Sequence, residues 1–145
     1  MSDEITHNAT TGLDLYACRF QVDGDVFLSN PASDEVWGTG GHTAADYYVD
    51  LTEEDASGHY KGDFASGGTI AAGYYHVTIY RQAGANPANS DVAIAQGDIP
   101  WDGTSEITGY TLYTSSTSVL GTFRQVDVTE NEAPGTNVSG IAGYL

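Results

Sequence analysis

Cysteine is almost absent from this chain of 145 residues, in which Cys18 stands alone. A single cysteine cannot form a disulfide within the chain, and no C-x-x-C pair or clustered Cys and His spacing occurs, which excludes disulfide scaffolds and zinc ribbons. At this length roughly two thirds of the unfolded chain's surface can be buried, so one domain can form a core without disulfides or a structural metal.

Basic residues are also scarce. The chain has 4 Lys and Arg against 20 Asp and Glu, a formal net charge of -16. Such a charge repels nucleic-acid phosphates and anionic lipids at long range, which argues against partners of either kind. The acidity fits either a well-solvated surface or adaptation to high salt, where self-repulsion is screened, and both explanations stay open.

Long apolar runs are missing as well. No run approaches the roughly 18 residues needed to cross a bilayer. The first residues, MSDEITHN, lack the basic and apolar regions of a secretory signal peptide. We therefore expect a soluble protein that is synthesised in a cytoplasm and has no membrane partner.

The residues that are abundant favour strands. The chain has 18 Gly and 10 Tyr, with many Thr and Val and few of the residues that fill helices. Strand-like segments of about 5 to 9 residues recur between turn signals, which is the rhythm of a β-sandwich or barrel. The composition and spacing therefore predict an all-β fold.

The first part of the chain predicts a hairpin and a loop. Residues 13–22 form the first expected strand, and the Asp23-Gly24-Asp25 turn follows. Residues 26–29 form the second, antiparallel strand of this hairpin. Residues 30–44 contain few apolar anchors and predict a long surface loop. A half-buried strand over residues 47–51 should follow, since apolar and mixed positions alternate there.

The middle of the chain predicts a second hairpin, between residues 58–64 and 72–81. Alternation places Tyr75, Val77 and Ile79 in the core. The opposite face should carry Tyr74, His76 and Tyr80.

Later segments predict further strands. Over residues 91–99 we expect Val92 and Ile94 to face inward, and we expect Trp101 to be a buried plug, because large aromatic residues are mostly buried. Residues 107–114 and 118–128 form the last expected pair of strands.

No recognisable catalytic motif occurs: G-x-S-x-G, H-E-x-x-H and the phosphate-binding glycine loop are all absent. His59 and His76 fall on the outward side of the second hairpin without an acidic residue in register, which disfavours a metal site. Asp23, Asp25 and the run 53–55 lack the alternating ligand spacing of a calcium loop. We expect no enzyme, cofactor or metal.

Two stretches carry a resemblance to known proteins. Residues 56–64, ASGHYKGDF, with residues 70–80, IAAGYYHVTIY, resemble paired motifs of immunoglobulin-like and fibronectin-like sandwiches. The resemblance implies an antiparallel β-sandwich of about 7 to 9 strands, with Tyr75 as a corner tyrosine. The expected organisation is then an N-terminal arm (1–10), a sandwich domain (11–128) and a C-terminal arm (129–145).

Residues 10–103 as a whole, from TGLDLYA near the start to IPWDG at the end, are similar to small structural proteins of tailed-phage gene clusters. This resemblance implies a non-enzymatic virion protein, made in the host cytoplasm, with a capsid decoration or cement subunit as its leading role. The implied partners are the major capsid protein or another virion protein, and further copies of the chain, for which a trimer is one arrangement.

Two sets of residues are candidates for partner binding. The first could form an exposed aromatic patch or else pack under loops; it consists of Trp37, Tyr48, Tyr74 and Tyr80. An exposed patch would also suit the alternative function, a carbohydrate-binding or adhesion (receptor-binding) module.

The second set follows the Pro134-Gly135 break and is too apolar for a solvated tail. We expect residues 133–145 to pack on another subunit through Val138, Ile141, Tyr144 and Leu145.

The charge distribution generates a prediction about salt. Thirteen acids lie in residues 1–72 and seven in 73–145, with two basic residues in each half, so the half-charges are -11 and -5. Because the Debye length falls from about 30 Å at 0.01 M to about 10 Å at 0.1 M, the melting temperature should rise over that range. Thermal unfolding followed by circular dichroism measures this. An unchanged melting temperature would show that the repulsion is already relieved.

Overall fold

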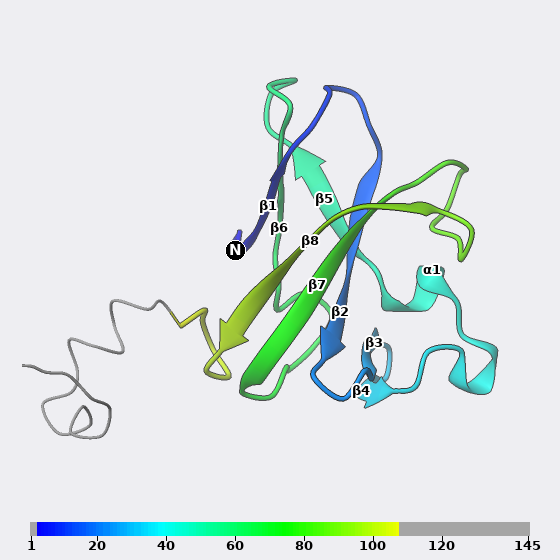
Figure 1. Cartoon of the computed structure of the whole chain (residues 1–145), viewed down its shortest axis with the longest axis vertical. Coiled ribbons are helices and arrows are strands. Elements are labelled where there is room, and N and C mark those ends of the chain that lie inside the picture. The colour runs from blue at the N-terminus through cyan, green and yellow to red at the C-terminus, as the bar shows by residue number, and fades with distance from the viewer. Residues whose placement is uncertain (1–2, 108–145) are drawn as a thin grey trace, which may run out of the picture. The chain divides into compact units, whose positions relative to one another are not determined.

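Antiparallel strands are the main regular secondary structure of residues 3–107, the part of the chain that this computed structural model describes (Figure 1). One short helix, α1 (Ala44–Tyr47), and a 3₁₀ turn, η1 (Thr39–Gly41), accompany them. The strands are β1 (Ile5–Asn8), β2 (Leu15–Gln21), β3 (Val26–Ser29), β4 (Ala32–Glu35), β5 (Val49–Glu53), β6 (His59–Gly62), β7 (Gly73–Arg81) and β8 (Val92–Trp101).

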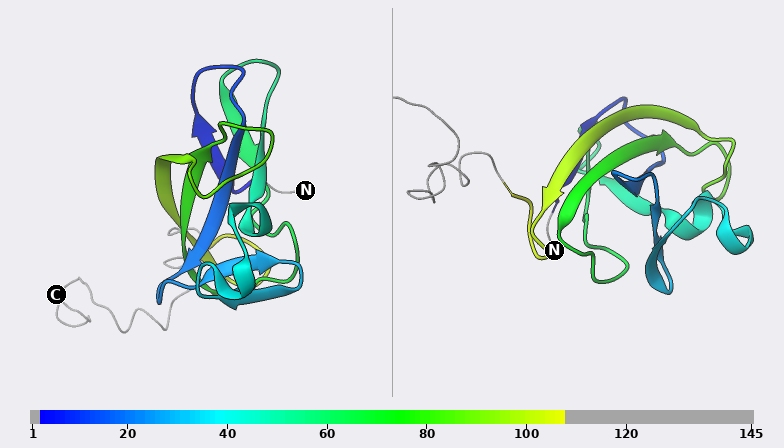
Figure 2. Two further views of the ribbon diagram at one scale, coloured as in Figure 1. Left: turned by 90° about the vertical axis from the view of Figure 1, so that its right-hand side faces the viewer. Right: turned by 60° about the horizontal axis from the view of Figure 1, so that its bottom comes forward.

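Strand β2 organises the sheet. One edge of β2 pairs with β7 along its whole length, while the other edge pairs with β5 near its start and with β3 at its end. β8 extends the sheet beyond β7, β6 and β1 extend it beyond β5, and β4 extends it beyond β3. The eight strands form one continuous sheet that curls into a nearly closed barrel (Figure 2). The all-β class is confirmed, and a two-sheet sandwich is not shown.

The first predicted hairpin is confirmed. Gly24 has a φ of 101°, a conformation that glycine adopts at little cost, and the Asp25 N–H donates to the Asp23 side chain at 3.1 Å. The Gln21 N–H donates to the Asp25 carbonyl at 2.8 Å, which closes the turn between β2 and β3.

The second predicted hairpin is wrong. β6 pairs with β1 and β5, and β7 pairs with β2 and β8, so β6 and β7 are not neighbours. Alternation identifies a strand's faces but carries no information about its partner, and the residues between β6 and β7 do not form a tight turn. Within β6 and within β7, the side chains nevertheless alternate between a buried and a more exposed face as predicted.

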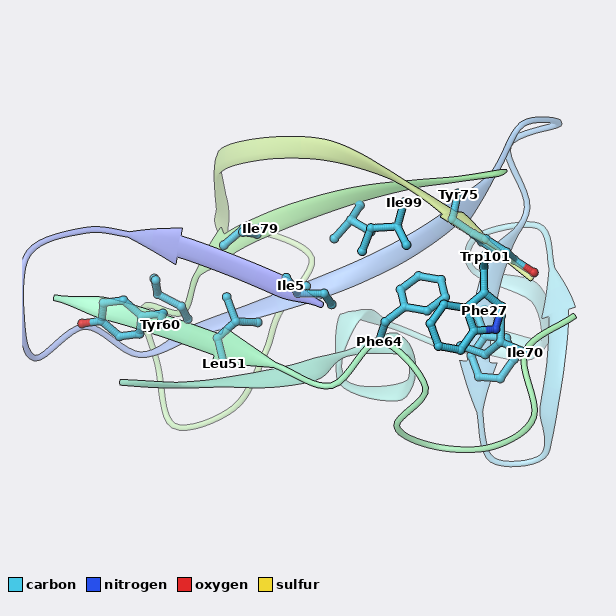
Figure 3. Close-up of a cluster of buried hydrophobic side chains, with 13 residues drawn as sticks. Ile5, Phe27, Leu51, Tyr60, Phe64, Ile70, Tyr75, Ile79, Ile99 and Trp101 are labelled. Carbon is cyan, nitrogen blue, oxygen red and sulfur yellow. The ribbon is translucent and has the colours of Figure 1, made fainter. Parts of the chain in front are cut away.

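The barrel interior holds the main hydrophobic core (Figure 3). Tyr75, Val77 and Ile79 are buried there, whereas Tyr74 is 55% exposed, so the predicted register of β7 is confirmed. Trp101 is buried, as expected, against Phe64. The Tyr75 hydroxyl donates to the Ala71 carbonyl at 2.8 Å.

A buried arginine lies against this core. The Arg19 guanidinium donates to the carbonyls of Phe64 and Ser66, both at 2.6 Å, and lies 4.7 Å above the centre of the Phe27 ring. Burial lowers the pKa of Arg19 to about 10. These bonds attach the segment after β6 to β2, so the arginine compensates part of its desolvation by ordering a loop.

A second, smaller core covers the outer face of β2. Tyr16 and Cys18 point outward from β2 and pack with Val26 and Leu28 of β3 and with α1. The Asp46 carboxylate accepts a hydrogen bond from the Thr43 N–H at 2.8 Å, which stabilises the start of the helix. Burial raises the pKa of the Cys18 thiol to about 12. Both faces of β2 are therefore covered.

The inward orientation predicted for Val92 and Ile94 is wrong, because these side chains are 65% and 39% exposed. In the β7–β8 register Ile99 lies opposite Tyr75 and Ala95 lies opposite Ile79. Residues opposite one another share a face, so the odd-numbered residues of β8 up to the bulge at Ile79/Tyr80 face the core. Ile94 is the extra residue at this bulge and has no partner on β7, so the alternation that places Ala95 and Ile99 inward does not extend to it.

Two other expectations differ from the structure. Residues 30–44, predicted as a loop, include β4, and Tyr47 lies in α1 although it was expected in a strand. Residues 5–8, placed in an N-terminal arm, form β1 and pair with β6, which buries Ile5 in the core. Neither β1 (ITHN) nor β4 (ASDE) contains an alternation of apolar and polar residues long enough to predict a strand.

Predictions for residues 108–145 lie outside the described residues. They include most of the last strand pair, the C-terminal arm, and its four apolar side chains. Within the described range, no helix combines the length and apolar character that a membrane span requires.

The core assignment of β7 predicts the effect of truncation. Ile79→Ala should lower the free energy of unfolding by about 2 to 5 kcal/mol, because it removes buried methyl groups and leaves a cavity. Ile94→Ala is the matched control on the neighbouring strand and should cost at most about 1 kcal/mol. Urea unfolding measures both values. Equal losses would contradict the orientations of β7 and β8.

Candidate functional site

Three of the four aromatic residues predicted to form a patch lie together outside the barrel. Trp37, Tyr48 and Tyr80 are partly buried against the second core, beside Tyr16. Tyr74 lies near the other end of β7, opposite Pro100, and is not part of this cluster. The structure therefore brings Trp37, Tyr48 and Tyr80 together and leaves Tyr74 apart.

Strand register explains why the tyrosines meet. Tyr16 and Tyr80 are cross-strand partners in the β2–β7 ladder, and their rings stack at 5.2 Å with an interplanar angle of 15°. Tyr48 follows α1 and contacts Tyr16 edge to face at 6.2 Å. Both arrangements are favourable for aromatic pairs.

Trp37 is supported by two further rings. It stacks on Phe20 at 6.0 Å and an angle of 18°, and it packs against Tyr47 of α1 at 4.7 Å. Phe20 and Tyr16 both have even numbers on β2 and therefore share its outer face. The cluster thus combines two stacked pairs, Tyr16 with Tyr80 and Phe20 with Trp37.

A cavity of about 280 Å³ opens at this cluster. We call the cavity and the residues that line it the aromatic site. Among residues 3–107, none of those that line the cavity is charged, although the chain has a net charge of -16. The lining residues are Tyr16, Phe20, Trp37, Ala44, Tyr80, Ala88 and Asn89.

Polar contacts fix the segment that closes one side of the cavity. The Tyr16 hydroxyl donates to Asp91 at 3.0 Å, and the same carboxylate accepts the N–H groups of Ala83 and Ala88 at 3.0 and 2.8 Å. These bonds hold the pKa of Asp91 below its ordinary range, the Ala88 N–H being the largest cause. Burial raises the pKa of Tyr16, which stays protonated as a donor.

Asn89 is oriented by a separate contact. Its Oδ1 accepts the Ala44 N–H at 2.8 Å, at the start of α1. This bond uses the acceptor end of the amide, so the Nδ2 group remains as a donor at the edge of the cavity. The aromatic site therefore offers the partly exposed rings of Phe20, Trp37 and Tyr80 together with a neutral donor, while the ring of Tyr16 is fully buried beneath them.

A larger, acidic groove of about 740 Å³ lies along β5 and β6, and Tyr48 lines this groove instead of the aromatic cavity. Lys61 lies within it, 3.2 Å from Asp3 and 3.4 Å from Glu54. Glu53, part of the run considered for calcium, accepts the N–H groups of Gly12 and Gly58 at 3.0 and 2.7 Å. Among residues 3–107, no cluster of three or more potential metal-ligating side chains occurs.

The two strand histidines do not share a hairpin. His59 Nδ1 lies 2.7 Å from Asn8 Oδ1, and His76 Nδ1 lies 2.9 Å from Asp98 Oδ1. The expectation that no acidic residue is in register was wrong for His76, because Asp98 is its cross-strand partner on β8.

Tyr16, Phe20 and Asn89 were not predicted as site residues. The alternation of Tyr16, Cys18 and Phe20 on β2 was available as a signal for one shared face. Asn89 had no such signal, since a turn asparagine ordinarily serves the local backbone.

Comparisons of the chain with family models, with curated proteins and with solved structures find no match. The assignment of a function therefore depends on the chemistry of the aromatic site and on the sequence patterns described above.

Proposed function

We propose that this protein is a non-enzymatic binding module of a phage-like virion and that its aromatic site recognises a neutral carbohydrate. The role is adhesion or receptor binding. The observation that carries this proposal is the cavity lined by the two stacked pairs, Tyr16 with Tyr80 and Phe20 with Trp37, and by no charged residue of the described part of the chain. The virion context comes from the resemblance of residues 10–103 to phage structural proteins.

The chemistry of the cavity suits a sugar. Aromatic faces pack against the C–H faces of a sugar ring, while the hydroxyl oxygens of the sugar accept hydrogen bonds from fixed donors such as Asn89 Nδ2. An anionic ligand would be repelled by the charge of -16, whereas a neutral one would not. Rigid aromatic side chains also lose little conformational entropy on binding.

The size of the cavity limits what it can hold. A volume of about 280 Å³ corresponds to roughly nine water molecules at about 30 Å³ each, close to the lower end of known ligand pockets. This matches one sugar ring. We therefore propose a single-ring subsite, with any longer saccharide extending into solvent.

The finer fold proposal, an immunoglobulin-like sandwich, has one supporting contact. The Tyr75 hydroxyl donates to a carbonyl four residues upstream, the kind of bond a corner tyrosine makes. The proposed function does not depend on this relation, because the aromatic site is built on the outer face of β2.

Sugar binding predicts the effect of removing one ring. Trp37→Ala should weaken the affinity for a neutral hexose or its oligosaccharides by at least about tenfold, equivalent to about 1.4 kcal/mol, because the ring lines the cavity. Tyr74→Ala is the matched control, since it removes an exposed aromatic residue outside the site. Titration calorimetry against a panel of neutral saccharides measures both. The proposal fails if the unaltered protein binds none of the panel.

A second candidate, a capsid decoration or cement subunit, is favoured by a different surface. The first half of β8 exposes Val92 and Ile94, and residues 92–97 contain no charged side chain. Exposed apolar strands of this kind pair readily with other chains unless they are covered. The proposed partners are the major capsid protein, another virion protein or further copies of this chain.

Deleting residues 133–145 tests the second candidate. If these residues are an assembly arm, the shortened chain should lose assembly in sedimentation while its melting temperature changes little. Assembly should be lost because the arm would bury its four apolar side chains on a neighbour. For each of the Val, Ile and Leu residues this burial stabilises the assembly by about 1.5 to 3 kcal/mol. Unchanged assembly, or failure to fold, would show that residues 133–145 are not an assembly arm.

A further inference from the structure

Trp37 is held in place by hydrogen bonds that involve the residues on both sides of it. The Tyr47 hydroxyl donates to Glu35 Oε1 at 2.8 Å and accepts the Gly38 N–H at 2.9 Å. Glu35 precedes Trp37 by two residues and Gly38 follows it directly. A single hydroxyl on α1 therefore links the chain before Trp37 to the chain after it.

The same carboxylate oxygen has a second partner. His42 Nδ1 lies 2.7 Å from Glu35 Oε1. The His42 ring also packs edge to face on Tyr47 at 6.1 Å, and Tyr47 packs against the Trp37 indole at 4.7 Å. Glu35, His42 and Tyr47 thus form one connected cluster, which we call the Trp37 clamp.

We propose that Glu35 is a positioning residue for the aromatic site, and that its pairing with His42 makes the position of Trp37 depend on pH. Glu35 does not line the cavity and acts only through Tyr47 and His42. The consequence for ligand affinity rests on the proposed function, whereas the effect on Trp37 does not.

The charges around the clamp set the direction of the effect. The charged groups facing His42 are Glu35, at the end of β4, and Asp46, in α1. The hydrogen bond to Glu35 is the main cause that raises the pKa of His42 above its ordinary value of 6.5. The same contact lowers the pKa of Glu35, with a smaller contribution from Tyr47.

The sign of the pH dependence follows from these directions. A raised histidine pKa means that the ion pair is fully formed below about pH 6.5 and is lost as the pH rises through the folded-state value. Glu35 remains ionised as the pH rises from 6 towards 9, since its pKa is lowered. The clamp should therefore loosen from pH 6 towards pH 9.

Tryptophan fluorescence measures this without a ligand. The chain has two tryptophans, and Trp101 is buried in the barrel, so the pH-dependent part of acrylamide quenching should come from Trp37. Quenching should increase by about twofold between pH 6 and pH 9 as the indole becomes more accessible. Trp37→Phe should remove this increase.

Three variants separate a positioning role from a structural one. Glu35→Gln should give high quenching at every pH, and His42→Asn should remove the pH dependence while the fold is retained in circular dichroism. His76→Asn is the matched control, because it removes a similar His–Asp contact on β7 and β8, and should keep the dependence of the unaltered protein. Quenching that does not vary with pH, or a His42→Asn variant that keeps the full variation, overturns the proposal.

Saccharide affinity measured over the same pH range then separates the proposed Trp37 clamp from the proposed carbohydrate binding. If the clamp works and the aromatic site binds sugar, affinity and quenching should change together. A pH-dependent Trp37 signal with no saccharide binding would support the clamp and reject the carbohydrate ligand.

Discussion

The fold depends on the requirement that β2 be covered on both faces. Residues Leu15 to Arg19 are all buried, so neither side of the strand can be left to solvent. The curled sheet covers one side by placing β2 against the interior of the barrel. The other side is covered by α1, by β3 and by the aromatic rings that gather on Tyr16. Burial of apolar area on both sides makes this strand the centre of the described sheet.

The aromatic site is a consequence of that covering. The outer face of β2 carries Tyr16, Cys18 and Phe20, and the segments that cover it come from distant parts of the chain. A cavity remains where the residue Trp37, the start of α1 and residues 88–89 meet this face, and aromatic residues form much of its lining. The polar contacts of Asp91, Asn89 and Glu35 then hold the covering segments in place.

Charged side chains are stabilised in different ways in the interior and on the surface of the protein. Arg19 is buried with two backbone carbonyls as hydrogen-bond partners and an aromatic ring beneath its guanidinium. Most of the acidic residues remain at least partly accessible to solvent, where self-repulsion is screened by salt. Such a surface repels anions at long range, which supports the neutral ligand that we propose for the aromatic site.

Local patterns in the sequence determined the all-β class, the turn at Gly24 and the inward positions of β7, because alternation and turn chemistry are properties of neighbouring residues. The barrel, the pairing of β6 with β1 and the bulge that leaves Ile94 exposed depended on the pairing of separate strands. The same holds for the aromatic site: Trp37, Tyr48 and Tyr80 were recognisable as aromatic residues, but only the β2–β7 ladder places Tyr80 on Tyr16. Strand pairing is decided by the burial of whole faces, which no short segment encodes.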